Sequence, residues 1–334
     1  MRAIVLVGGF GTRLRPLTLH TPKQMLPVVD RPMIERVVAG LGEVGVTDAI
    51  LSLGYRPDAF FDAYPDDTID GVKLHYAVEP EPLDTAGAIR FAAIDAGVDS
   101  RFIVVNGDVL TDLDIGRLWA THAEHGAEGT IALTPVEDPS RYGVVPLHAD
   151  GRVEAFIEKP PPGEAPSNWI NAGTYVLEPS VIDRIAAGRR VSIEREIFPA
   201  MVTDSVLFGL QSDAYWVDAG TPEAYLRCQL DLVDGVRGKE VALDPTADID
   251  DHAVIDHTVV MAGARIAAGA EVRDSVLLPG AVIEADATVD GSIIGPGAII
   301  GARASLSELS VVGHDVRIDA GATLVGARVP DTQD

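Results

Sequence analysis

Cysteine and long apolar segments are what this sequence has least of. Cys228 is the only cysteine among 334 residues, which excludes an intrachain disulfide and gives no sign of an oxidising compartment. No apolar run approaches the roughly 18 residues that span a bilayer. The apolar run at residues 3–7 is followed neither by a long hydrophobic region nor by a small-residue cleavage site, so we interpret it as a buried strand and not as a signal peptide. We therefore predict a cytoplasmic protein.

Basic residues are scarce as well. The chain has 26 Lys and Arg against 51 Asp and Glu, which gives a net charge of −25. Such an excess repels nucleic acid and anionic membranes, so we expect neither as a partner. It would also repel a phosphorylated substrate on average. An enzyme with such a substrate must therefore gather its few cations, or a metal ion, at one place.

The sequence changes character near residue 240. Before that point, apolar runs alternate with helical patterns: runs lie at 3–7, 49–53, 72–78 and 102–105, and helical patterns follow Pro32 and lie near 57–63 and 86–97. Residues 129–177 are richer in strands, and helices return near 180–187, 193–202 and 222–234. This rhythm predicts an α/β fold, a Rossmann-like, doubly wound mixed sheet with ligands at the carboxyl ends of its strands. We predict a catalytic domain over residues 1–240.

After about residue 243, glycine, alanine and β-branched residues dominate, and apolar residues recur every six positions. They fall in three registers: Val254, Val260, Ile266, Val272 and Leu278; then Ile283 and Val289; then Ile294, Ile300, Leu306, Val312, Ile318 and Leu324. A small residue lies two positions before many of them. This hexapeptide repeat is typical of a left-handed parallel β-helix. We predict such a domain over residues 241–334, with about four coils of about eighteen residues.

The loop after the first strand has the composition of a phosphate site. It reads Gly8-Gly9-Phe10-Gly11-Thr12-Arg13-Leu14-Arg15, and Lys23 follows. Glycines after a buried strand let backbone N–H groups approach phosphate oxygens. The spacing fits neither Walker A nor the dinucleotide-binding pattern, and glycines alone are also compatible with a plain tight turn. Three cations so close by, in so acidic a chain, favour an anion site.

These residues begin a series of motifs that resembles the sugar-nucleotide pyrophosphorylases, a family of nucleotidyltransferases. The further motifs are Glu81-Pro82-Leu83-Asp84-Thr85-Ala86-Gly87, Asn106-Gly107-Asp108, Tyr142-Gly143-Val144-Val145, Phe156-Ile157-Glu158-Lys159-Pro160, Ile170-Asn171-Ala172-Gly173 and Trp216-Val217-Asp218-Ala219-Gly220-Thr221-Pro222. The resemblance spans the chain, because many members of that family carry the same β-helical tail. Within the family, the sequence is most similar to the mannose-1-phosphate guanylyltransferases.

The resemblance implies a role for each matching residue. Nucleotide binding is implied for Gly8, Gly9, Gly11, Thr12, Arg13, Glu79, Glu81, Leu83, Thr85, Gly87 and Asp108. Contacts with the sugar phosphate are implied for Gly143, Glu158, Lys159 and Asn171. Asp108 and Asp218 would ligate Mg²⁺, a hard ion that prefers oxygen ligands, and Arg13 and Lys23 would join them as catalytic residues. Considered alone, Asp108 could equally cap a turn, Glu158 and Lys159 could be an exposed ion pair, and Gly143 could mark a close strand crossing.

The implied reaction is an in-line displacement at the α-phosphorus of a nucleoside triphosphate. The attacking atom is a phosphate oxygen of a sugar 1-phosphate, which is ionised at neutral pH, so no general base is required. This agrees with the motifs, since none of the eight histidines lies in one. Catalysis would come from holding two anions in line and from neutralising the charge that develops.

We expect GTP and mannose 1-phosphate as the substrates. A carboxylate, Glu79 or Glu81, can accept the N1–H and N2–H₂ donors of guanine as a pair, although both are equally compatible with solvated loop charges. A glucose-1-phosphate thymidylyltransferase, or a synthase for an unusual sugar or cyclitol phosphate, stays open, because position 84 is Asp where the family usually has Gly.

Two alternatives come from other classes of protein. A non-catalytic regulatory paralogue is disfavoured, because all the charged motif residues are present: Arg13, Lys23, Asp108, Lys159 and Asp218. An acyltransferase in the tail is disfavoured because the β-helix is short. We instead expect the β-helix to serve assembly into a homo-oligomer, or regulation.

Overall fold

The computed structural model describes residues 1–237 and 239–331 of the chain. By their contacts the residues form two compact units: unit 1 is Met1–Gly9 with Ile34–Trp216, and unit 2 is Phe10–Met33 with Val217–Asp334. Unit 1 thus holds most of the predicted catalytic domain, whereas residues 10–25, which we call the signature loop, group with the tail. The domain boundary that the sequence suggested at residue 240 stays a prediction.

Unit 1 is built on a ten-stranded mixed sheet with the order β11-β10-β12-β7-β1-β4-β6-β5, in which β9 also pairs with β12, and β13 pairs with β9. Its strands are β1 (Arg2–Leu6), β4 (Asp48–Leu53), β5 (Thr68–Ile69), β6 (Val72–Val78), β7 (Phe102–Asn106), β9 (Gly129–Pro135), β10 (Gly143–Val144), β11 (Ile157–Glu158), β12 (Trp169–Leu177) and β13 (Leu207–Gln211). The central strands β7, β1, β4 and β6 are parallel, and β12 is antiparallel to β7. The predicted Rossmann-like mixed sheet is confirmed.

The helices of unit 1 follow the predicted alternation with strands. They are α1 (Met33–Glu43, whose first residue belongs to unit 2), α2 (Asp58–Ala63), α3 (Asp84–Asp95), α4 (Ile115–His125), α5 (Ser180–Asp183), the π-helical η5 (Ile193–Ile197) and α6 (Phe198–Thr203), with a 3₁₀ turn at η4 (Pro139–Arg141). The helix expected over 180–187 is the single turn α5, after which the chain turns at Gly188, whose φ is 67°. The short strand β8 (Val109–Thr111) also belongs to unit 1, whereas β14 (Trp216–Asp218) begins at the last residue of unit 1 and continues into unit 2.

The buried centre of unit 1 explains why polar residues gather at one edge of the sheet. Ile4, Ile50 and Val104 lie fully buried on neighbouring parallel strands. Parallel strands covered on both faces present only their ends to ligands. Gly8 and Gly9 follow one residue after the end of β1, and Asp108 follows one residue after the end of β7. The carboxyl edge of this sheet is therefore where the site is to be sought.

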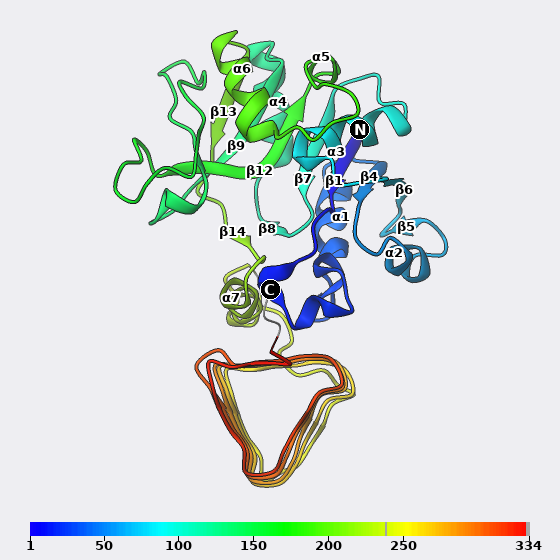
Figure 1. Cartoon of the computed structure of the whole chain (residues 1–334), viewed down its shortest axis with the longest axis vertical. Coiled ribbons are helices and arrows are strands. Elements are labelled where there is room, and N and C mark those ends of the chain that lie inside the picture. The colour runs from blue at the N-terminus through cyan, green and yellow to red at the C-terminus, as the bar shows by residue number, and fades with distance from the viewer. Residues whose placement is uncertain (238, 332–334) are drawn as a thin grey trace. The chain divides into compact units, whose positions relative to one another are not determined.

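Unit 2 contains a parallel β-helix, which is seen end-on as a triangle in Figure 1. Each side of the triangle is a five-stranded parallel sheet. The strands are β15 (Asp248–Ile249), β18 (Arg265–Ile266), β21 (Val282–Ile283), β24 (Ile299–Ile300) and β27 (Arg317–Ile318); β16 (Val254–Asp256), β19 (Glu271–Arg273), β22 (Thr288–Asp290), β25 (Ser305–Ser307) and β28 (Thr323–Val325); and β17 (Val259–Val260), β20 (Val276–Leu277), β23 (Ile293–Ile294), β26 (Val311–Val312) and β29 (Arg328–Val329). The predicted left-handed parallel β-helix is confirmed, with five coils where about four were expected.

The register of the coils accounts for the breaks in the sequence repeat. Asp248 pairs with Arg265, and Arg265 with Val282, so these coils have 17 residues, whereas Ile299 pairs with Arg317, 18 residues on. A 17-residue coil is one residue short of three hexapeptides, which moves the inward position by one. Leu277, and not Leu278, therefore lies in the interior cluster. Val254 opens the predicted repeat, whose apolar residues should face the interior, and this part of the prediction is wrong: Val254 is 45% exposed, and its neighbour Ile255 packs against the interior.

The rest of unit 2 consists of short turns and one helix. The signature loop forms three 3₁₀ turns, η1 (Thr12–Leu14), η2 (Leu17–Leu19) and η3 (Lys23–Met25), before the hairpin of β2 (Pro27–Val28) and β3 (Arg31–Pro32). Helix α7 (Pro222–Asp234) begins as predicted, because the Thr221 hydroxyl accepts a hydrogen bond from Ala224 N–H and Pro222 occupies the first helical position. Over residues 1–237 and 239–331, no helix is both long and apolar enough to cross a membrane.

Candidate active site

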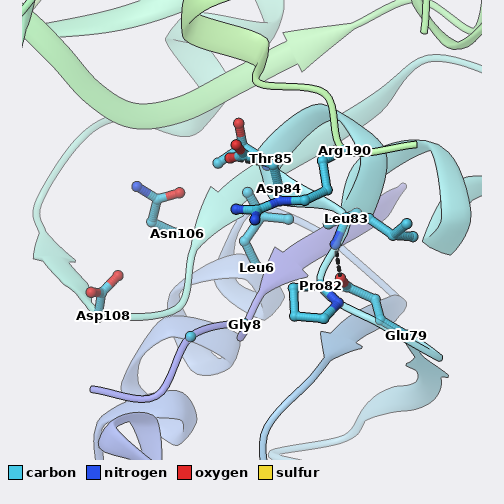
Figure 2. A pocket seen from close by; sticks show the side chains of 12 residues that line it. Leu6, Gly8, Glu79, Pro82, Leu83, Asp84, Thr85, Asn106, Asp108 and Arg190 are labelled. Carbon is cyan, nitrogen blue, oxygen red and sulfur yellow. Dashed lines mark hydrogen bonds between the residues drawn. The ribbon is translucent and has the colours of Figure 1, made fainter. Parts of the chain in front are cut away.

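A pocket of about 330 Å³ opens at the carboxyl edge of the unit 1 sheet. It is lined by Leu6, Gly8, Gly9, Glu79, Pro82, Leu83, Asp84, Thr85, Ala88, Asn106, Asp108 and Arg190. Figure 2 shows Asn106 and Asp108 on one side of this pocket and Glu79 with Leu83 on the other, with Gly8 between them. The pocket thus joins the start of the glycine-rich loop, the segment after β6 and the end of β7, as the predicted topology requires.

Glu79 is held firmly at the rim of this pocket. The half-buried carboxylate accepts hydrogen bonds from the Ser52 hydroxyl at 3.0 Å and from Leu83 N–H at 3.1 Å. Burial raises the pKa of Glu79 above its ordinary value, while these two hydrogen bonds oppose the rise. A Cβ at Gly8 would lie 3.9 Å from the Glu79 Oε1 atom. The carboxylate therefore faces the phosphate loop from a fixed position.

The loop from Leu83 to Gly87 is braced from a distant part of the chain. Val191 N–H donates to Leu83 O, and Val191 O accepts from the N–H groups of Ala86 and Gly87, at 2.9 to 3.1 Å. The Thr85 hydroxyl donates to Glu194 at 2.7 Å. A Cβ at Gly87 would lie 2.8 Å from the Leu83 Cβ, so Gly87 is required for packing here and does not line the pocket.

Asp84 takes a backbone conformation that favours glycine. Its φ is 62°, in the left-handed region where Asp is one of the few tolerated residues. Its own carboxylate accepts a hydrogen bond from Thr85 N–H at 2.9 Å. This geometry explains why the resembling family usually has Gly at the position, and how this chain accommodates Asp.

Asp108 lies at the end of β7 and is 9% exposed. The preceding Gly107 N–H donates to Leu6 O at 2.9 Å, which ties the end of β7 to the end of β1. Asn106 packs against Gly173, where an added Cβ would lie 2.5 Å from the Asn106 amide nitrogen. The carboxylate of Asp108 is thus presented to the pocket by two paired strands.

Three of the four predicted sugar-phosphate residues lie on adjacent strands of unit 1, and Lys159 directly follows the strand that carries Glu158. Gly143 in β10 pairs with Glu158 in β11, and β10 also pairs with β12, which carries Asn171. A Cβ at Gly143 would lie 2.6 Å from Phe156, so a close approach of side chains requires this glycine. Glu158 and Lys159 form an ion pair at 3.4 Å, with the lysine side chain 63% exposed. The Asn171 amide donates to the Tyr175 hydroxyl and accepts from Gly173 N–H, both at 2.9 Å.

The signature loop in unit 2 is compact at its glycine. Gly11 has a φ of 61°, and its carbonyl accepts a hydrogen bond from the Thr18 hydroxyl at 2.7 Å. A Cβ at Gly11 would lie 3.0 Å from Thr18 and 3.3 Å from the Lys23 Cβ. The absence of a Cβ at Gly11 therefore lets Lys23 lie beside the glycine-rich turn.

Arg13 and Asp218 meet over Gly220 in the same unit. The Arg13 Nη2 and Asp218 Oδ2 atoms are 3.9 Å apart, with the side chains 55% and 26% exposed. Gly220 N–H donates to Asp218 Oδ1 at 2.9 Å, and a Cβ at Gly220 would lie 2.6 Å from Arg13 Nη2. The absence of a side chain at Gly220 thus allows a cation and a carboxylate to approach each other.

Asp108 and Asp218 are each of the ligand type that magnesium takes together with substrate oxygens. Among the described residues, no group of three or more His, Cys, Asp or Glu side chains is placed to hold a metal. Mg²⁺ is usually bound through one or two carboxylates together with substrate phosphates and water. Asp108 in unit 1 and Asp218 in unit 2 supply hard oxygen atoms of this kind.

The structure brings together only some of the predicted nucleotide-binding residues. Gly8, Gly9, Glu79, Leu83, Thr85 and Asp108 line the pocket. Glu81 is exposed and does not line it, and Gly11, Thr12 and Arg13 belong to unit 2. Sequence reasoning missed Arg190, an exposed residue that extends towards the middle of the pocket in Figure 2. Arg190 lies in none of the motifs, so the sequence offered no reason to choose it. It lies at the pocket because its neighbour Val191 is hydrogen-bonded to the loop at Leu83.

Comparison with known proteins agrees with this geometry. The model of the family described as nucleotidyl transferase matches residues 2–235, and that of a GMPPB C-terminal domain matches residues 238–333. A mannose-1-phosphate guanyltransferase of Schizosaccharomyces pombe is 46% identical over 230 residues, which cover 68% of this chain and 62% of that protein. A mannose-1-phosphate guanylyltransferase of Mycobacterium tuberculosis is 40% identical over 281 residues, which cover 81% of this chain and 77% of that protein.

A solved structure resembles the chain over the same region. HddC from Yersinia pseudotuberculosis, complexed with GMP-PN, has 31% sequence identity and a TM-score of 0.59, and covers 68% of this chain and 97% of that one. The motifs, the fold and the family model agree over most of the sequence. The chain belongs to the nucleotidyl transferase family.

Proposed function

We propose that this protein transfers GMP from GTP to mannose 1-phosphate, in a Mg²⁺-dependent reaction that releases pyrophosphate. The observation that carries the proposal is the position of Glu79, a half-buried carboxylate that lines the pocket beside the glycine-rich loop. Guanine presents two adjacent donors that a carboxylate accepts as a pair, whereas thymine and uracil present only one such donor. The names of two relatives, both mannose-1-phosphate guanylyltransferases, support the same base and the same sugar.

The chemistry is a displacement in which one bond forms and one breaks at the α-phosphorus. A phosphate oxygen of the sugar 1-phosphate bonds to the α-phosphorus, while the bond to the oxygen bridging to the β-phosphorus breaks and pyrophosphate departs. The N–H groups of Gly8 and Gly9 would bind the triphosphate. Arg13 would hold its negative charge, and Lys23 would stabilise the departing pyrophosphate. Glu158, Lys159, Asn171 and Gly143 would hold the sugar phosphate in line.

Asp108 and Asp218 would hold the metal ion. When bound, Mg²⁺ would neutralise negative charge on the phosphate oxygens. The ion pair between Arg13 and Asp218 suggests that Asp218 also orients Arg13. A cytoplasmic location stays a prediction from the sequence.

The test is a grid of GTP, dTTP, UTP and ATP against mannose, glucose and galactose 1-phosphates, read by pyrophosphate release. We expect the highest kcat/KM for GTP with mannose 1-phosphate. Faster turnover of dTTP with glucose 1-phosphate would instead assign the thymidylyltransferase alternative. No turnover of any pair would contradict the proposal and leave a synthase for an unusual sugar or cyclitol phosphate, or a non-catalytic role.

A further inference from the structure

The last coil of the β-helix contacts the signature loop within unit 2. Arg328 begins β29, and its Nη1 atom donates to the carbonyl of Arg13 at 3.2 Å and to that of Arg15 at 3.5 Å. These carbonyls lie on either side of Leu14, at the end of the 3₁₀ turn η1. The Arg328 guanidinium in the C-terminal coil therefore holds the backbone of Arg13, and the side chain of Arg13 faces Asp218.

The neighbouring coil contacts the loop at two further points. Gly313 follows β26, which pairs with β29, and a Cβ there would lie 3.1 Å from the Pro16 Cβ. The rings of His20 and His314 meet edge-on with their centroids 6.3 Å apart. The loop is thus in contact with two adjacent coils between residues 13 and 20.

The backbone at Arg13 is folded by a short turn around the buried Leu14. The turns η1, η2 and η3 have three residues each, and such short 3₁₀ turns are weak because their hydrogen-bond geometry is poor. The direction of the Arg13 side chain therefore depends on the contacts of this turn as well as on Asp218. A charged guanidinium bound to carbonyls is a stronger contact than a neutral hydrogen bond.

We propose that Arg328 is a positioning residue for nucleotide binding: the terminal coil of the β-helix holds the Arg13 carbonyl and so keeps the Arg13 side chain beside Asp218. This inference rests on the proposed role of Arg13 in binding the triphosphate. It gives the β-helix a part in the catalytic cycle, because whatever displaces the terminal coil also displaces Arg13.

The experiment compares Arg328→Met with Arg317→Met in the full chain. Arg317 is a matched control, since it is another arginine of the β-helix, paired with Glu284 at 2.8 Å and placed outside the proposed machinery. Steady-state kinetics with GTP and mannose 1-phosphate are combined with hydrogen exchange of the loop amides and with thermal melting. Arg328→Lys, which keeps a cationic donor, serves as the conservative variant.

We expect Arg328→Met to raise the KM for GTP about tenfold, with the KM for mannose 1-phosphate and the Tm close to wild type. The amides of Leu14 and Arg15, which donate to the carbonyls of Gly11 and Thr12, should exchange faster. Arg328→Lys should recover part of the affinity, and Arg317→Met should change nothing. A second route to the same effect is Gly313→Ala, whose added Cβ would press on Pro16 in the loop and on Val329 and Pro330 in the terminal coil.

Two results would overturn the proposal. One is an unchanged KM for GTP with unchanged exchange in the loop. The other is a fall in Tm with faster exchange throughout the β-helix, which would assign Arg328 a purely structural role. If the wild type turns over no nucleotide, the proposed function fails, while exchange at Leu14 and Arg15 still decides whether Arg328 holds the loop.

Discussion

Glu79 and Glu81 are two positions apart in the sequence, yet only Glu79 lines the pocket. Sequence reasoning placed both beside the nucleotide base and had no means to choose between them. The segment after β6 is irregular and contains Pro80 and Pro82, so side-chain direction follows no fixed period. The hydrogen bonds from Ser52 and Leu83 to Glu79 decide it, and such contacts between distant residues are not visible in one sequence.

We predict that Glu79→Gln weakens the preference for GTP and removes a pH dependence from the stability of the fold. The folded pKa of Glu79 is raised by burial, so its contribution to stability is present below the unfolded pKa and is lost as pH rises through the folded pKa. A neutral amide removes that dependence, but it keeps only one oxygen to accept the hydrogen bonds that Ser52 and Leu83 donate to the two carboxylate oxygens. The ratio of kcat/KM for GTP and ATP should fall about tenfold, and the Tm of the variant relative to that of wild type should be higher at about pH 8 than at about pH 4.

Glu81→Gln is the matched control for this substitution, because Glu81 is exposed and outside the pocket. It should change neither quantity. An unaltered nucleotide preference in Glu79→Gln would exclude this carboxylate from base recognition, whatever happens to the Tm.

Asp108 could be identified from its motif, but its surroundings could not. A second prediction is that Asp108→Asn lowers kcat by at least about a hundredfold, because the variant loses a charged metal ligand. Asp108 is 9% exposed at the end of a strand, and the amide keeps its shape, so the fold should persist. Near-UV circular dichroism controls for folding, and Mg²⁺ titration measures the metal requirement. Wild-type turnover by the variant, or by the parent in excess chelator, would rule out a metal at this residue.

Helices and strands with strong local sequence signals could be predicted, but the turns that connect them could not. Helix α7 begins at the predicted residues because a cap and a proline fix it locally. The 17-residue coils were missed, because a repeat of six in the sequence does not show which corner lacks a residue. The sequence likewise did not show which residues His257 contacts. It contacts Asp234, the last residue of α7, at 3.0 Å and Asp274 at 2.5 Å.

We therefore expect the attachment of α7 to the β-helix to depend on the protonation of His257. Its hydrogen bond with Asp274, and then the one with Asp234, raise the folded pKa above the ordinary value against the opposing effect of burial. The stabilisation is full below the unfolded pKa and is lost as pH rises through the folded pKa. We predict that His257→Gln lowers the Tm at about pH 6 and has little effect at about pH 9. A Tm difference that is equal at both pH values would show that charge plays no part.

At the scale of the whole molecule, the sequence suggested a catalytic domain followed by a tail. By contacts, however, the signature loop groups with the tail. A single sequence could not show this, because the contact of Arg328 with the carbonyl of Arg13 joins residues 315 positions apart. The grouping also changes how assembly must be tested. Removal of the residues after 240 would also remove Arg328, the partner of the signature loop. Point substitutions in the β-helix test assembly without this second effect.

We predict that the β-helix drives homo-oligomer formation. Val254 in β16 and Val325 in β28 belong to the first and last strands of one sheet and are 45% and 56% exposed. Open sheet edges with apolar side chains tend to be covered by another chain. Val254→Asp with Val325→Asp should lower the mass measured by light scattering. The control is Ile94→Asp in α3, which is also exposed, at 54%. An unchanged mass in the double variant would place the contact elsewhere.

The central claim, nucleotidyl transfer from GTP to a sugar 1-phosphate, is tested most directly by following the phosphates. Two reactions are run with mannose 1-phosphate and Mg²⁺, one with GTP labelled at the α-phosphate and one with GTP labelled at the γ-phosphate. In-line displacement at the α-phosphorus predicts α-label only in the sugar nucleotide and γ-label only in pyrophosphate. Transfer of γ-label to the sugar phosphate, or α-label found only in free GMP, would contradict the account.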